Sequence, residues 1–142
     1  MYMVRAGLFD DVDAVLHWHP SSSNAANAES SNANKSAKFR FSGISAHAAG
    51  SPHKGRSALD GVEAMNMMVN MMREHIPQAS RIHYVITKGG LAPNVIPDVA
   101  EVYYYVRHPK RDKVQEIFNW VVKASEGAAM GTETTVTHEV MH

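Results

Sequence analysis

Cysteine is absent from the 142 residues, which excludes disulfide bonds and thiolate metal ligands and agrees with a cytoplasmic protein. No apolar run approaches the ~20 residues of a membrane span, and the first residues lack the layout of a signal peptide. We therefore expect no membrane partner. Basic and acidic side chains balance at 14 each without a long basic run, so we expect no nucleic-acid partner either.

Histidine, in contrast, is abundant. The sequence holds nine histidines that are scattered rather than gathered in a terminal tag, and they keep metal chemistry open. A chain of this length is sufficient for one domain with a sizeable core.

Hydrophobic periodicity predicts six elements after residue 34. We expect strands over residues 35–42, 81–87, 99–107 and 132–141, and helices over residues 57–74 and 112–126, the second ending near Gly127. The order strand, helix, strand, strand, helix, strand predicts an α+β fold of the ferredoxin-like β-α-β-β-α-β type. Its sheet would be four-stranded and antiparallel, with both helices on one face.

The first 35 residues differ in composition from the rest. Residues 13–19 are apolar and partly β-branched, and Pro20 follows, so we expect a strand that places His17 and His19 on one face. Two imidazoles are fewer ligands than a zinc site needs. Residues 21–35 are rich in Ser, Asn and Ala and predict a flexible linker. We therefore divide the chain into an end fragment at 1–20, a linker at 21–35 and a folded domain at 36–142.

The helix predicted at 57–74 has one apolar stripe, one polar stripe and two further methionines. Met67 and Met71 lie beside the apolar stripe and widen it. They predict a broad core face or, since methionine suits adaptable interfaces, a second surface that is buried at a subunit contact. The apolar stripe is Leu59, Val62, Met65, Val69 and Met72, and the polar one is Glu63, Asn66, Asn70 and Arg73. In a ferredoxin-like sheet, strand 81–87 lies at an edge, where the unpaired backbone groups of an apolar strand can pair with another chain. We predict a homodimer through strand 81–87 and helix 57–74, and we expect Val85→Pro to remove an edge donor.

One loop, between the first strand and the first helix of the domain, combines two histidines with glycine and proline. It runs Gly-Ile-Ser-Ala-His47-Ala-Ala and then Pro52-His53-Lys-Gly55-Arg-Ser-Ala58-Leu59-Asp60. A loop histidine can face a ligand, but residue type alone favours a histidine with a local hydrogen bond.

These motifs resemble the signature of the lid, or dimerisation, domain of the di-zinc aminoacylase and carboxypeptidase G family of metallohydrolases. Two later stretches are similar to that family as well: Gly89-Gly90-Leu-Ala-Pro93-Asn94-Val-Ile-Pro97-Asp98 and Val102-Tyr-Tyr-Tyr-Val-Arg107. Residues 7–20 and 126–135 resemble the aminobenzoyl-glutamate hydrolase subfamily. The resemblance covers nearly everything except residues 21–35.

The resemblance implies roles for four residues. His47 matches a histidine that donates to the carbonyl oxygen of a substrate held by the partner protomer, an oxyanion-stabilising role. Asn94 matches a substrate-binding asparagine, although a turn residue is an equal alternative. Arg107 matches an arginine that binds a substrate carboxylate, or else it forms a surface salt bridge. His19 matches a metal ligand, whereas we expect His53 to hold the loop.

The resemblance therefore implies the lid of a zinc-dependent amidohydrolase that cleaves N-acyl or N-aroyl amino acids such as aminobenzoyl-glutamate. The chain lacks the other ligands of a two-zinc site, so we expect it to be inactive alone and to hold no zinc tightly. One alternative is a stand-alone ferredoxin-like module for ligand binding or assembly. Another is a metal-binding domain that uses His17 and His19.

Overall fold

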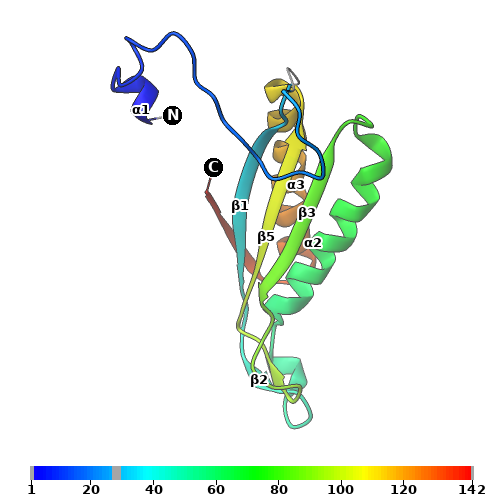
Figure 1. The fold of residues 1–142 in the computed structure, drawn as a ribbon. Helices are drawn as coiled ribbons and strands as arrows, with labels where there is room; N and C mark the ends of the chain where they lie inside the picture. Colours follow the sequence, from blue (N-terminus) through cyan, green and yellow to red (C-terminus); the bar gives the residue numbers. More distant parts are fainter. Residues whose placement is uncertain (1, 27–29, 142) are drawn as a thin grey trace.

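The computed structural model describes residues 2–26 and 30–141. Its main sheet has the order β3-β5-β1-β6, with every neighbouring pair antiparallel. The strands and helices of this body are β1 (Ala33–Ser42), α2 (Ala58–Met72), β3 (Arg81–Lys88), β5 (Val99–His108), α3 (Arg111–Gly131) and β6 (Thr135–Val140). Both helices cover one face of the sheet and leave the other open (Figure 1). The predicted α+β, ferredoxin-like fold is confirmed.

Several short elements lie outside the six predicted ones. A separate two-stranded sheet pairs β2 (Ala46–His47) with β4 (Val95–Ile96), at the end of the molecule shown lowest in Figure 1. Strands of two residues leave no periodicity to read in a sequence. The remaining short helices are α1 (Tyr2–Arg5), η1 (Pro52–Lys54) and η2 (Arg73–His75). None of the helices in the described ranges is long and apolar enough to cross a bilayer.

The core lies between the sheet and the two helices. Of the three consecutive tyrosines, Tyr104 points into this core, while Tyr103 and Tyr105 lie on the open face and are half-buried. The Tyr104 hydroxyl donates to Asn66 Oδ1, and its burial raises the pKa of this hydroxyl. Asn66, expected on the polar stripe of its helix, is therefore only 6% exposed. The sequence pattern did not show that the buried Tyr104 hydroxyl would need Asn66 as its hydrogen-bond partner.

The strand predicted over residues 13–19 is wrong. Residues 14–20 have no regular structure, and the Trp18 side chain is 80% exposed. No described strand runs beside this segment, and an extended chain needs a neighbour to accept its backbone hydrogen bonds. The first strand of the domain also begins earlier than predicted, because β1 starts at Ala33 rather than at residue 35.

Helix α3 continues past Gly127, where we expected it to end, and runs to Gly131. Its end is set instead by Thr132, whose N–H and hydroxyl both donate to the Ala128 carbonyl. Glu133 follows with a φ of 52°, the left-handed conformation that commonly terminates helices. Because this position usually holds glycine, Gly127 was the more plausible terminator in the sequence.

A buried carboxylate, Glu101, lies on the open face of the sheet and is 3% exposed. Its oxygens accept from Arg40 Nη2 at 2.7 Å and from the Thr87 hydroxyl at 2.8 Å, and Lys38 Nζ lies 3.8 Å away. An irregularity in the β3–β5 pairing at Thr87 accompanies this contact. Burial raises the pKa of Glu101, but the hydrogen bonds from Thr87 and Arg40 and the two positive charges hold it below its ordinary value.

Replacing Glu101 should change how stability depends on pH. A lowered folded-state pKa means that the unfolded chain binds the proton more tightly. The stabilisation is therefore present above the unfolded pKa of roughly 4.3 and is lost as pH falls. We expect Glu101→Gln to lower the free energy of unfolding by about 1–3 kcal/mol at neutral pH, and to flatten its dependence between about pH 5 and 3. Urea titrations check this, with Glu139→Gln on the same face as control; equal slopes in wild type and Glu101→Gln would contradict it.

Candidate functional site

The β2–β4 sheet and the loops that continue it form the segment that we call the tip (Figure 1). His47 of β2 and Asn94, which comes directly before β4, have neighbouring backbones there. His47 is paired with Val95 across the two strands, and the Ala48 N–H donates to the backbone carbonyl of Asn94 at 3.0 Å. Both side chains are exposed. Chain folding thus brings together two residues that lie far apart in the sequence.

The loop fixes how the His47 ring presents its two nitrogens. Nδ1 accepts from the backbone N–H of Ala49 at 3.2 Å and of Gly50 at 3.0 Å. A ring nitrogen that accepts carries no proton in the neutral imidazole, so the proton is on Nε2. The local hydrogen bond of an ordinary loop histidine is therefore present, and it makes Nε2–H of an exposed side chain the available donor.

Arg56 joins the tip to the body of the domain. Its backbone pairs with Ile44, and its guanidinium forms an ion pair with Glu133. The same guanidinium donates to the carbonyls of Gly55 at 2.6 Å and His53 at 3.3 Å. His53 therefore takes part in holding the loop through its backbone. Nothing in the sequence indicated this arrangement, because Arg56 and Glu133 are 77 residues apart.

Arg107 lies at the opposite end of β5 from the tip. Its Nε donates to Asn34 Oδ1 at 3.4 Å, and its guanidinium carbon lies 5.3 Å from the centre of the Tyr105 ring. Within the described residues it forms no salt bridge, which was the alternative to a binding role. The extended strand that separates it from Val99 is roughly 26 Å long. One chain therefore does not bring Arg107 together with His47 and Asn94.

His19 lies in the irregular segment before the domain, and its side chain is exposed. Its Nδ1 is 2.8 Å from the carbonyl of Pro20. No group of three or more His, Asp or Glu side chains within residues 2–26 and 30–141 is placed to hold a metal ion. The described residues do not form a zinc site, so a metal role for His19 requires ligands from outside those residues.

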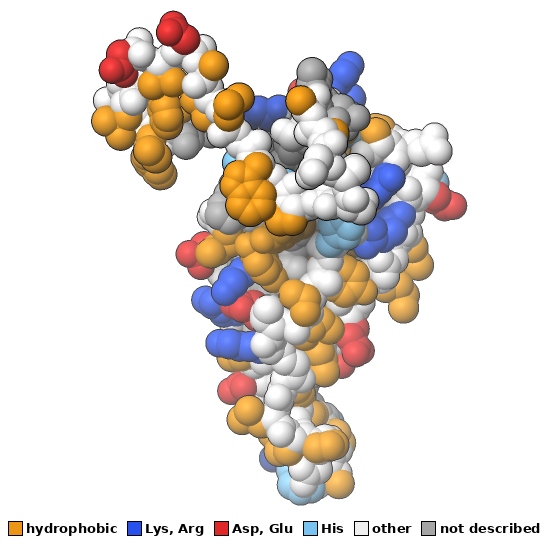
Figure 2. Space-filling view, in the orientation of Figure 1, with side chains coloured by type: hydrophobic (Ala, Val, Ile, Leu, Met, Phe, Trp, Pro, Cys, Tyr) orange, Lys and Arg blue, Asp and Glu red, His pale blue; other side chains and the backbone are white. Residues whose placement is uncertain are grey.

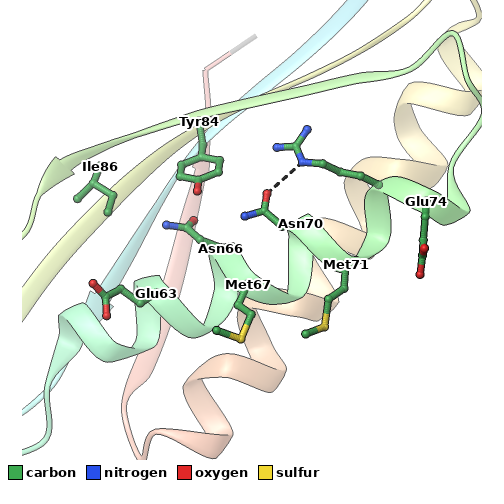
Figure 3. A pocket seen from close by; sticks show the side chains of 9 residues that line it. Glu63, Asn66, Met67, Asn70, Met71, Glu74, Tyr84 and Ile86 are labelled. Atoms are coloured by element: carbon green, nitrogen blue, oxygen red, sulfur yellow. Dashed lines mark hydrogen bonds between the residues drawn. The ribbon is translucent and has the colours of Figure 1, made fainter.

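A groove of mixed polarity lies where α2 borders the edge strand β3. Met67 and Met71 are 63% and 62% exposed, so they are not part of the core face. Together with Tyr84 and Ile86 they supply the apolar lining of the groove (Figure 3), and its polar lining is Glu63, Asn66, Asn70, Arg73 and Glu74. We call Met67, Met71, Tyr84 and Ile86 the methionine groove. The position of β3 at the edge of the sheet confirms that part of our sequence prediction.

The unpaired backbone groups of β3 belong to alternate residues. Arg73 Nη1 donates to the Ile82 carbonyl at 2.6 Å, so that carbonyl points away from β5. Backbone groups alternate in direction along an antiparallel strand, so Tyr84 also faces outward and Val85 faces β5. Our expectation that Val85→Pro removes an edge donor is therefore wrong, because the outward N–H of this pair is that of Tyr84.

With this geometry, the comparisons with known proteins identify the family. The family model described as the peptidase dimerisation domain matches residues 30–132, and the chain belongs to this family. It is 52% identical over 136 residues to one of the subunits of p-aminobenzoyl-glutamate hydrolase from Escherichia coli (strain K12), covering 95% of this chain and 28% of that protein. It is 31% identical over 137 residues to the Xaa-Arg dipeptidase of Mus musculus, covering 96% of this chain and 32% of that protein.

Solved structures agree with the family. The aminobenzoyl-glutamate utilization protein from Klebsiella pneumoniae superimposes with a TM-score of 0.69 at 25% identity, covering 98% of this chain and 37% of that one. A hydantoinase/carbamoylase family amidase from Burkholderia ambifaria has the same fold, with a TM-score of 0.74 at 15% identity over 80% of this chain and 28% of that one. This chain thus spans about a third or less of the curated relatives described above.

Proposed function

We propose that this chain is the lid and dimerisation domain of a zinc-dependent amidohydrolase that cleaves N-acyl or N-aroyl amino acids such as p-aminobenzoyl-glutamate. Membership of the dimerisation family and the 52% identity to one component of p-aminobenzoyl-glutamate hydrolase support it. In this proposal residues 1–20 end a catalytic domain, residues 21–32 form the connection, and the lid begins with β1 at Ala33. The observation that carries the site is the exposed His47 side chain, whose Nδ1 accepts backbone N–H groups and leaves Nε2–H available as a donor.

His47 would act on the scissile amide. When the amide is attacked, negative charge develops on its carbonyl oxygen, and a fixed N–H donor aimed at this oxygen stabilises the transition state. Nδ1 is already occupied by backbone N–H groups, so the ring needs no reorientation to present Nε2–H. The Asn94 amide, in the turn before β4, would hydrogen-bond the same substrate.

Arg107 would bind the carboxylate of the substrate's amino acid, because the planar guanidinium presents N–H donors that match the two carboxylate oxygens. Because roughly 26 Å of strand separates it from the tip, one lid cannot place both ends on a single small substrate. If both ends act, His47 and Asn94 come from one protomer and Arg107 from its partner. A composite site of this kind requires a dimer.

The proposed dimer forms through β3 and α2. Two β3 edges paired about a two-fold axis would extend the sheet, and the methionine grooves would cover each other. The partner is a second copy in this proposal. The relatives include components of p-aminobenzoyl-glutamate hydrolase that carry different subunit names, one from Escherichia coli and a homolog of the other, 24% identical over 144 residues, from Haemophilus influenzae. A related, non-identical chain is therefore the other outcome to test.

The experiment compares this chain with its full-length parent. We expect the parent to release p-aminobenzoate from p-aminobenzoyl-glutamate and to retain zinc after dialysis, and the 142-residue chain to do neither, because one histidine cannot complete a zinc site. Stoichiometric zinc held by the isolated chain with a nanomolar Kd would contradict the proposal. A dimeric parent without hydrolase activity towards any N-acyl amino acid would favour an assembly module instead.

A further inference from the structure

The tip is joined to the body of the domain at a narrow base. Backbone hydrogen bonds hold this base together: the Gly43 N–H donates to the Asp98 carbonyl and the Ala58 N–H to the Pro97 carbonyl, both at 2.8 Å. Figure 2 shows the tip as a slender extension of the body, with histidine at its far end. Small changes in a few backbone angles at such a base tilt the whole extension, so contacts beside the base decide where the far end lies.

One side-chain interaction connects the base of the tip to the body. The Arg56 guanidinium, on the tip, forms an ion pair with the Glu133 carboxylate. Glu133 belongs to the body, because it lies in the turn between α3 and β6. Of the side-chain hydrogen bonds among the described residues, this is the one that joins the two parts; the others made by the tip stay within it.

The backbone of Glu133 does not explain why a glutamate stands at this position. Its φ of 52° is left-handed, a conformation that glycine adopts freely and that crowds any side chain. Glycine would therefore form this helix end more easily than glutamate does. The carboxylate adds nothing to the turn itself, and its contact with Arg56 is what the side chain contributes.

The contacts of Arg56 continue through the loop to His47. Arg56 Nη1 donates to the carbonyls of Gly55 at 2.6 Å and His53 at 3.3 Å, at the end of the short helix η1. At the start of that helix, the Ser51 N–H donates to the His47 carbonyl at 3.0 Å. A guanidinium that shifts away from the body therefore moves the loop that holds His47.

We propose that Glu133 is a positioning residue, which acts through Arg56 to fix the tilt of the tip and hence the place of the His47 Nε2–H. This rests on the proposed function, in which that N–H stabilises the developing oxyanion. A misplacement of about 1 Å at a reacting group can cost up to about 10²-fold in rate. The ion pair is exposed to water, so losing it shifts the tilt of the tip only in part.

Glu133→Gly in the full-length parent separates positioning from folding. Glycine removes the carboxylate and relieves the left-handed backbone, so we expect a thermal midpoint within about 3 °C of wild type. With p-aminobenzoyl-glutamate, kcat should fall about fivefold and KM should change less than about twofold, because the donor acts mainly in the transition state. The matched control is Glu116→Gln, which breaks the exposed ion pair with Lys113 on α3 and should leave kcat unchanged.

Two further measurements test the route through Arg56 and the tilt itself. In Arg56→Ala the partner of Glu133 is already lost, so adding Glu133→Gly should change kcat less than about twofold. Residual dipolar couplings of the 142-residue chain report the angle between the amide groups of the tip and those of the body without any hydrolysis. We expect this angle to change in Glu133→Gly and to stay as in wild type in Glu116→Gln.

The proposal is overturned if kcat of Glu133→Gly stays within about twofold of wild type, if the losses of Glu133→Gly and Arg56→Ala multiply, or if the dipolar couplings of the tip are the same in Glu133→Gly as in wild type. If the parent cleaves p-aminobenzoyl-glutamate equally well with and without the Glu133 carboxylate, only this inference fails. If the parent cleaves no N-acyl amino acid while the couplings change in Glu133→Gly, the tilt depends on Glu133 and only the proposed function fails.

Discussion

His47→Ala in the full-length parent is expected to lower kcat by about 10²–10³, the usual cost of removing one oxyanion donor. KM should change much less, because the hydrogen bond strengthens mainly as charge develops in the transition state. Steady-state kinetics with p-aminobenzoyl-glutamate measure both constants. His47→Gln keeps an amide donor near this position and should retain part of the lost rate.

His53→Ala is the matched control for this result. His53 lies in the same loop, but the contact it makes there runs through its backbone carbonyl, so we expect kcat within about threefold of wild type. Equal losses in His47→Ala and His53→Ala would show that the loop histidines serve only the fold. A large rise in KM with unchanged kcat in His47→Ala would assign His47 to ground-state binding.

Tyr84→Pro should convert the dimer of this chain largely to monomer. The substitution removes an outward N–H of the edge strand, and the two-fold axis repeats the loss in the partner, so a pair of hydrogen bonds disappears from each dimer. We expect the dimer Kd to rise about 100-fold, measured by sedimentation velocity. Tyr84→Ala is the matched comparison: it removes the ring, which stacks on Tyr104 and lines the groove, but keeps the N–H. The dimer Kd should therefore rise further in Tyr84→Pro than in Tyr84→Ala.

Val85→Pro should behave differently at the adjacent position. Its N–H faces β5, so proline there breaks the internal ladder and should lower the thermal midpoint rather than only dissociate the dimer. If wild type itself sediments as a monomer at high concentration, the proposed interface does not form between two copies of the isolated chain.

The repeating elements of this fold could be predicted from sequence, because burial imposes a period. The alternation of Phe39 and Phe41 with Lys38 and Arg40 predicts the face that β1 buries, and the structure buries both phenylalanines. The burial of a polar side chain that depends on one contact far away in the sequence could not be predicted. Asn66 is buried because of Tyr104.

In the candidate site, too, the residues could be predicted from the sequence but their arrangement could not. The motif around His47 could be found from its resemblance to a family, and so could Asn94 and Arg107. Their arrangement could not, because it follows from the β2–β4 pairing and from the length of β5.

The central claim is that the lid acts on the partner's substrate, and mixed dimers of two inactive parents test it most directly. One parent carries His47→Ala with intact metal ligands. The other keeps His47 and has its metal site broken by substitution of the ligands, His19 among them. In a mixed dimer one active site collects both defects and the other collects none, so we predict that activity returns. Mixed dimers, verified by two different tags, that remain inactive would contradict the account.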